Sequence, residues 1–132
     1  MLEKINILAV LVAAVSAFFL GGLWYSKALF GALWQKETGI TDEKAAGNAG
    51  RTFGGAFVLS LVASVTFALF LGEESTAAFG AGAGATAGVC WVAGSFGINY
   101  LFEKKSLKLF LVNGGYHTVQ YTLMGVILGA WH

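Results

Sequence analysis

Charged side chains are confined to a few short parts of this 132-residue chain, and this confinement limits the folds open to it. Every Asp, Glu, Lys and Arg lies in one of four ranges: 3–4, 27–51, 73–74 and 103–108. Four long stretches carry no charge: 5–26, 52–72, 77–102 and 109–131. About 20 apolar residues in a helix are enough to cross the hydrocarbon core of a membrane. The pattern therefore predicts a single transmembrane domain over residues 1–132, with four spanning helices.

The composition argues against the alternative, a soluble bundle of four core helices. The chain is 57% hydrophobic and 11% charged, whereas soluble domains average about 25% charged residues. Helices of a soluble bundle carry a charged outer face, and these stretches have none. We predict an all-α membrane protein whose four helices form an antiparallel bundle surrounded by membrane lipids. A net charge of +1 provides no basic surface for nucleic acid.

Lysine and arginine are unevenly divided between the two sides of the predicted membrane. Seven of the eight lie in the loops 27–51 and 103–108, and Lys4 alone lies on the other side. Because basic loops remain in the cytoplasm, we expect both loops inside the cell and both termini outside the cytoplasm. The stretch 5–26 could instead be a signal peptide, but no cleavage site of small residues closes it. We interpret it as a retained helix.

Aromatic residues gather where the first stretch ends and the loop 27–51 begins. The apolar side chains there recur at helical spacing and include Trp24, Tyr25, Phe30 and Trp34. Trp and Tyr prefer the headgroup level of a membrane. These residues therefore predict a short amphipathic helix lying in the inner membrane interface. A cytoplasmic gate or docking surface beneath the bundle is the less favoured alternative.

Small residues recur at regular spacing in the third stretch. One row holds Gly80, Gly84 and Gly88 and continues to Ser95. An α-helix turns by about 100° per residue, which places a second row on nearly the opposite side. That row holds Gly82, Thr86, Cys90, Ala93 and Gly97. Small residues let membrane helices approach closely, so we predict that one row packs within the bundle and the other packs against a neighbouring helix or subunit of a homo-oligomer.

The fourth stretch is the most polar, and it holds His117, the one ionisable side chain in any of the spans. Ionisable groups within a membrane often mark functional paths. Asn113, His117, Gln120 and Tyr121 fall on one helix face, and counting from the loop 103–108 places Ser95, Asn99 and Ser60 at matching depths. We expect a neutral imidazole bonded to Ser95 or Ser60. The candidate binding residues are His117, Asn113, Tyr121, Gln120, Ser95, Asn99 and Ser60.

The same polar residues do not form a recognisable catalytic or metal-binding set. No carboxylate and no second histidine accompanies His117 within a span. A Ser-His-Asp arrangement is therefore absent from the spans, and no phosphate-binding motif occurs. We expect no cofactor and no metal, and an enzyme is the less favoured reading.

Three groups of residues resemble a known family. They are Asn6; then Gly21, Trp24, Tyr25, Ser26, Leu29, Phe30, Gly31 and Trp34; and finally Asn113, Gly115, Tyr116 and His117. Across its whole length the chain is similar to small bacterial four-helix membrane proteins that form a domain-of-unknown-function family. It departs from their pattern by an additional small residue, Gly114, before the Gly-Tyr-His string. The resemblance implies an integral membrane protein and no established activity, substrate or cofactor. We expect this protein in the cell inner membrane.

Two functions fit these patterns. The first is a small oligomeric module that binds or passes a small solute or lipid near the fourth stretch. The second is a structural or interaction protein without a ligand, in which the polar residues serve helix packing. The two differ in whether the face of Asn113, His117 and Tyr121 lines an open cavity or lies in tight contact.

The distribution of lysine and arginine generates a prediction about topology. A reporter domain fused after His132 should be active only in an assay of the compartment outside the cytoplasm, because the C-terminus lies opposite the basic loops. Reporter activity in the cytoplasm would reverse the predicted orientation.

Overall fold

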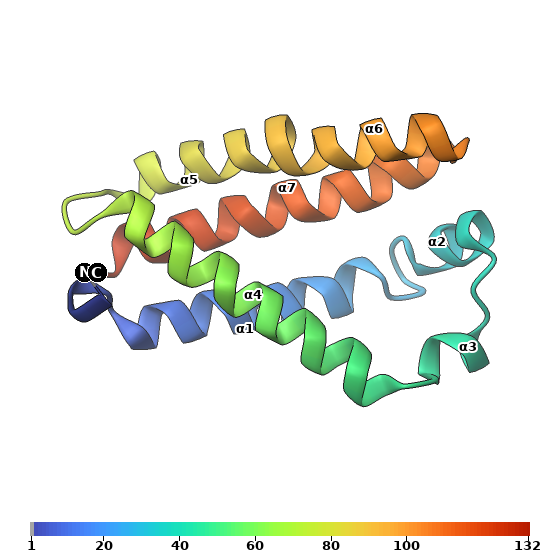
Figure 1. The fold of residues 1–132 in the computed structure, drawn as a ribbon, viewed down its shortest axis with the longest axis horizontal. Coiled ribbons are helices and arrows are strands. Elements are labelled where there is room, and N and C mark those ends of the chain that lie inside the picture. The colour runs from blue at the N-terminus through green and yellow to red at the C-terminus, as the bar shows by residue number, and fades with distance from the viewer. Residues whose placement is uncertain (1) are drawn as a thin grey trace.

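The structure is a computed structural model that describes residues 2–132, all of whose regular elements are helices (Figure 1). In chain order they are a 3-10 turn η1 (Leu2–Lys4), α1 (Ile7–Trp24), α2 (Gly31–Thr38), α3 (Asp42–Ala46), α4 (Ala49–Leu71), α5 (Ala77–Thr86), a π-helix η2 (Ala87–Ala93), α6 (Gly94–Glu103) and α7 (Leu107–Ala130). The elements α5, η2 and α6 form one continuous rod. Figure 1 shows α7 beside this rod, α4 crossing α1, and both chain ends at the end of the molecule opposite α2.

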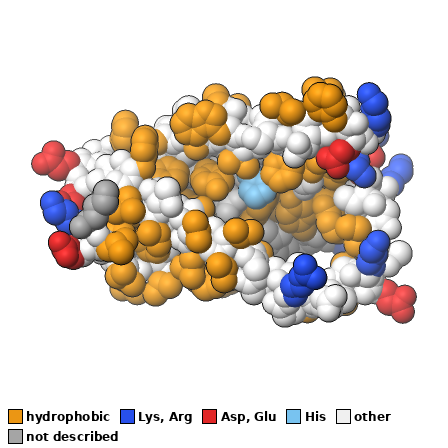
Figure 2. All heavy atoms as spheres, in the orientation of Figure 1, with side chains coloured by type: hydrophobic (Ala, Val, Ile, Leu, Met, Phe, Trp, Pro, Cys, Tyr) orange, Lys and Arg blue, Asp and Glu red, His pale blue; other side chains and the backbone are white. Residues whose placement is uncertain are grey.

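Within residues 2–132, three helices are long and apolar enough to cross a membrane: α1, α4 and the rod of α5, η2 and α6. Their outer surfaces are largely hydrophobic, and the charged side chains lie toward the two ends of the molecule (Figure 2). The prediction of an all-helical protein is thereby confirmed, and three of the four predicted spans are candidate membrane-spanning helices by length and composition. At 24 residues α7 is also long enough to cross a membrane, but the polar residues in its centre make it less apolar than these three helices.

The rod and α7 approach each other so closely that their backbones touch. A Cβ atom added to Gly80 would lie 1.9 Å from the carbonyl oxygen of Gly125, and one added to Gly84 would lie 2.0 Å from that of Tyr121. At Gly88 the added atom would lie 2.6 Å from the Cα atom of Thr118. No side chain fits in these gaps. The three glycines predicted to serve helix packing therefore lie in the contact between the rod and α7.

The π-helix η2 shifts which residues of the rod face α7. After Gly88 the next contact comes five positions later, at Ala93, whose Cβ atom lies 3.1 Å from a Cβ added to Gly114. Gly97 follows and lies against the ring of Phe110. A π-turn accommodates one residue more than an α-turn, so the contact row passes from the first predicted row of small residues to the second.

This shift corrects the prediction for Ser95. In a continuous α-helix Ser95 would follow Gly88 on the face toward α7. In the structure Ser95 is exposed, and its hydroxyl donates to the Trp91 carbonyl of its own helix at 2.6 Å. The N-terminal part of the second row, which includes Gly82 and Cys90, also lies on the exposed side of the rod.

The core between α1, α4 and α7 joins small side chains of α1 to larger apolar side chains of α4 and α7. Ala9, Ala13 and Ala17 are fully covered on α1, and Met124 of α7 is fully buried beside them. Ser64 of α4 is also buried, and its hydroxyl donates to the Val10 carbonyl at 2.9 Å. The buried residues of α4 all lie in its C-terminal half, whereas residues 49–56 are exposed. The two halves of α4 therefore have different surroundings, and its N-terminal half diverges from the bundle (Figure 1).

The predicted short helix after the first span is present as α2. It ends at Gly39, whose φ of 73° lies in the left-handed region that favours glycine. The hydroxyl of Thr41 then accepts from the backbone N–H of Lys44 and caps the five-residue α3. Whether α2 lies in a membrane interface stays a prediction.

The contact between the two backbones generates a prediction for a pair of glycines. Gly84→Ala should lower the free energy of unfolding by about 1–3 kcal/mol, because its Cβ atom overlaps the backbone of α7. Gly82→Ala is the matched control, since no atom lies within 4 Å of its added Cβ. Unfolding in mixed micelles measures both variants. Equal stability of the two would contradict the backbone contact.

Candidate functional site

Aromatic residues at the end of α1 attach it to the N-terminal half of α7. The indole Nε1 of Trp24 donates to the Val112 carbonyl at 2.9 Å, and the Trp24 ring lies 4.9 Å from the ring of Phe30 between centroids. A Cβ atom on Gly115 would lie 3.0 Å from the same indole. The glycine next to Tyr116 thus makes room for Trp24.

A chain of hydrogen bonds continues from α1 through α7 to α6. The hydroxyl of Tyr25 donates to Oδ1 of Asn113 at 2.6 Å, and Nδ2 of Asn113 donates to the hydroxyl of Tyr100 at 2.7 Å. Both ends of the Asn113 amide are therefore used inside the protein. This part of the predicted binding face acts in packing, as expected when polar groups join membrane helices.

His117 has its polar partner on its own helix. Its Nδ1 lies 2.8 Å from Oε1 of Gln120, a side chain that is only 5% exposed. An amide oxygen only accepts hydrogen bonds, so Nδ1 carries the proton in this arrangement. The imidazole stacks on Phe96, with ring centroids 5.2 Å apart, and meets the ring of Tyr116 edge-on.

The expected bonds from His117 to Ser95 and Ser60 are not formed, so this prediction is wrong. Ser95 is turned outward by the π-helix, and Ser60 lies on the divergent half of α4. The remaining candidates are also separated from His117. Asn99 is exposed on α6, and Tyr121 stacks on Phe67 of α4 with centroids 6.4 Å apart. The predicted binding residues thus do not form one site.

A cavity of about 830 Å³ lies between the C-terminal end of α1, the short helices α2 and α3, and the divergent half of α4. We call it the α1–α4 cavity, and Figure 2 shows this face hollowed. Its apolar lining includes Phe18, Trp34 and Phe53. Tyr25 and Ser60 also line it, and α7 contributes Tyr116. The Tyr116 hydroxyl donates to the Ala17 carbonyl at 2.8 Å, which holds α7 against this part of α1.

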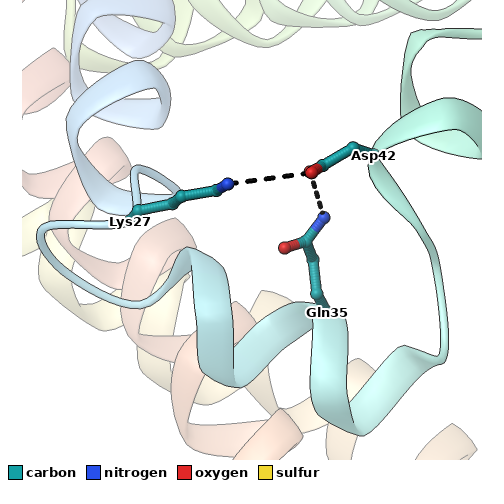
Figure 3. A network of polar contacts seen from close by, with 3 residues as sticks. All are labelled: Lys27, Gln35 and Asp42. Carbon is teal, nitrogen blue, oxygen red and sulfur yellow. Dashed lines mark hydrogen bonds and ion pairs between the residues drawn. The ribbon is translucent and has the colours of Figure 1, made fainter.

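The mouth of the α1–α4 cavity carries a small polar network (Figure 3). The Asp42 carboxylate accepts a hydrogen bond of 2.7 Å from Nε2 of Gln35, and its second oxygen lies 3.7 Å from Nζ of Lys27. These two partners hold the pKa of Asp42 below its ordinary value, the amide of Gln35 first and the charge of Lys27 second. All three side chains line the cavity, and so does Lys44.

A second hollow, the α4–α5 groove, runs between α4, α5 and η2 over Tyr121. Its volume is about 790 Å³, and it is lined mainly by aromatic and small residues, among them Phe70, Phe79, Gly82 and Trp91. Within residues 2–132 no three His, Cys, Asp or Glu side chains gather as metal ligands would.

Sequence reasoning missed the residues at the mouth of the cavity. The candidate binding residues included neither Lys27 nor Gln35 nor Asp42. Trp24, Tyr25, Phe30 and Trp34 were assigned to a membrane interface, and two of them, Tyr25 and Trp34, line the α1–α4 cavity. The signal that could have found this cavity is the aromatic string itself, which occurs next to a loop of mixed charge.

Comparison with known proteins identifies a family. The sequence model of a family described as "Protein of unknown function (DUF1761)" matches residues 8–129. No curated protein and no solved structure matches the chain.

The bond between Tyr25 and Asn113 generates a prediction for a pair of tyrosines. Tyr25→Phe should lower the free energy of unfolding by about 0.6–1.7 kcal/mol, the range for hydrogen bonds between membrane helices. Tyr121→Phe is the control, because within the described chain the Tyr121 hydroxyl makes no hydrogen bond. In the Asn113→Ala variant, Tyr25→Phe should lower the free energy of unfolding by less than it does in the wild type. An unchanged cost there would show that the bond does not contribute.

Proposed function

The chain belongs to the DUF1761 family of proteins of unknown function, and we propose that it is a four-span membrane protein that binds a small amphipathic molecule in the α1–α4 cavity. α7 is the fourth span in this proposal. It lies between the rod and α1 (Figure 1), and its polar residues from Asn113 to Thr122 are buried or half-buried. Asn113, Gln120 and the Tyr116 hydroxyl are bonded within the protein. A helix enclosed in this way needs less apolar surface of its own.

The observation that carries the proposal is the α1–α4 cavity. Ligand sites typically measure about 300–1,000 Å³ and combine apolar walls with a few polar groups. The cavity has a volume of about 830 Å³, and aromatic rings form much of its inner part. Charged and amide side chains lie at its mouth. This order of apolar inside and polar outside favours a molecule with a hydrocarbon part and a polar head.

The predicted topology places this cavity on the cytoplasmic side of the inner membrane, with both termini on the opposite side. The loop that carries α2 and α3 is the basic loop 27–51, and basic loops remain in the cytoplasm. A single-chain amphiphile entering from the inner leaflet would already have its head at the level of the mouth. We therefore favour a lipid-like ligand over a freely soluble one.

The second candidate function is a structural module without a ligand. The observation in its favour is that both ends of the Asn113 amide, and Oε1 of Gln120, are bonded inside the protein. Assembly into a homo-oligomer would then use the exposed small residues of the rod, among them Gly82 and Cys90. In this reading the α1–α4 cavity would contain only membrane lipid without fixed stoichiometry.

Filling the cavity separates the two functions. We expect the wild type to bind 1-monolauroylglycerol or dodecyl phosphate at one molecule per chain, measured by native mass spectrometry and by the rise in melting temperature with ligand concentration. Ser60→Trp should weaken this binding about tenfold or more, because the indole occupies the cavity that Ser60 lines.

The neighbouring substitution Leu59→Trp is the control. Leu59 is 70% exposed on the outer surface of α4 and does not line the cavity, so its variant should bind as the wild type does. If neither amphiphile binds, or if both tryptophan variants bind equally well, the ligand-binding function is wrong and the structural module is favoured.

A further inference from the structure

We infer that the ligand of the α1–α4 cavity carries an anionic head group, and that Asp42 occupies the head-group site as an internal competitor. The inference rests on the proposed function and adds the charge of the ligand to it. The chemical class is a single-chain amphiphile that ends in a carboxylate or a phosphate.

The first argument is that two donors at the mouth already hold an anionic group. Nε2 of Gln35 and Nζ of Lys27 approach the two oxygens of the Asp42 carboxylate, at 2.7 and 3.7 Å. The three residues come from α2, the loop before it and α3 (Figure 3). A ligand carboxylate or phosphate presents oxygens of the same kind to such donors. The arrangement therefore shows which chemistry the mouth recognises.

The second argument is the charge of the mouth. Lys44 also lines the cavity, and no ion pair joins its ammonium group to another residue of the described chain. Lys27 and Lys44 together exceed the single carboxylate of Asp42 by one positive charge. Once Asp42 is displaced, both ammonium groups remain to face an incoming anion, whereas a cationic or neutral head would leave Asp42 as the better partner.

The third argument is that Asp42 can leave at small cost. The side chains of Lys27 and Asp42 are 79% and 75% exposed, and ion pairs this exposed contribute little to stability. α3 contains no buried residue. Among the described residues, Asp42 makes all the side-chain hydrogen bonds and ion pairs that join α3 to α1, α2 or the loop between them.

The backbone around α3 is consistent with such a movement. Two residues in the left-handed region bracket the segment, Gly39 with φ 73° and Asn48 with φ 53°. No core contact has to break when this segment shifts locally. The exposed Asp42 side chain can therefore leave its two partners, while Lys44 and the other lining residues of the segment stay at the cavity.

The test compares two amphiphiles with equal chains, dodecyl phosphate and 1-monolauroylglycerol, on the purified full-length protein. The wild type should bind dodecyl phosphate more tightly than the neutral glyceride. Asp42→Asn should strengthen dodecyl phosphate binding roughly two- to fivefold, the scale of one exposed ion pair, and should leave the glyceride unchanged. Lys27→Gln should weaken the binding of dodecyl phosphate alone.

The matched control is Glu43→Gln, which removes a negative charge from the adjacent position. Glu43 neither lines the cavity nor contacts Lys27 or Gln35, so it should change dodecyl phosphate binding less than Asp42→Asn does. Equal effects of the two variants would show that the net charge of the loop, and not the position of Asp42, determines the affinity. That result would overturn the inference. Equal affinity for both amphiphiles, unchanged in Asp42→Asn, would also overturn it while the proposed function stands.

Two further outcomes act on the proposed function itself. Binding of neither amphiphile would remove the cavity as a ligand site. Inorganic phosphate that binds as tightly as dodecyl phosphate would show that the hydrocarbon chain contributes nothing, and the amphiphilic ligand would be excluded. We expect inorganic phosphate to bind far more weakly, because it leaves the aromatic lining of the cavity unfilled.

Discussion

The contact between two backbones, that of the rod and that of α7, is the interaction on which the rest of the structure depends. Gly80, Gly84 and Gly125 let the helices touch along their carbonyl groups. In a membrane there is little hydrophobic gain from joining two helices, so close packing and hydrogen bonds must hold them together. The contact fixes the rotation of α7, and that rotation directs Asn113 toward Tyr25 and Tyr100 and Tyr116 toward Ala17.

The cavity exists because α1 and α4 separate beyond the contact of Phe18 with Phe57. Near the chain termini, alanines of α1 and Ser64 of α4 form a tight contact. At the opposite end the aromatic residues after α1 are committed to α7, through Trp24 and Tyr25. α4 has no comparable partners there, and residues 49–56 remain exposed. The hollow is thus a by-product of where the polar contacts of α1 are made.

Patterns along the chain predict the helices well and their mutual contacts only in part. The charge-free stretches predict the helices because the formation of a helix depends on residues that are neighbours in the sequence. The packing role of Gly80, Gly84 and Gly88 could also be predicted, since residues four positions apart lie on one face of a helix. The π-turn has no such signature, so Ser95 was placed on the wrong face. The pairing of Tyr25 with Asn113, 88 positions apart, depends on how the helices rotate, which no local spacing encodes.

The π-turn also bears on how this protein can change during evolution. The segment 87–93 contributes to the fold mainly through its number of residues. One additional residue there rotates all later residues of the rod by about 100° about the helix axis. Removing a residue there would leave α5 in place and rotate α6 as a unit, carrying Tyr100 away from Asn113. Apart from Gly88 and Ala93, which contact α7, the segment should therefore accept many replacements of one side chain by another, while insertions and deletions within it are selected against.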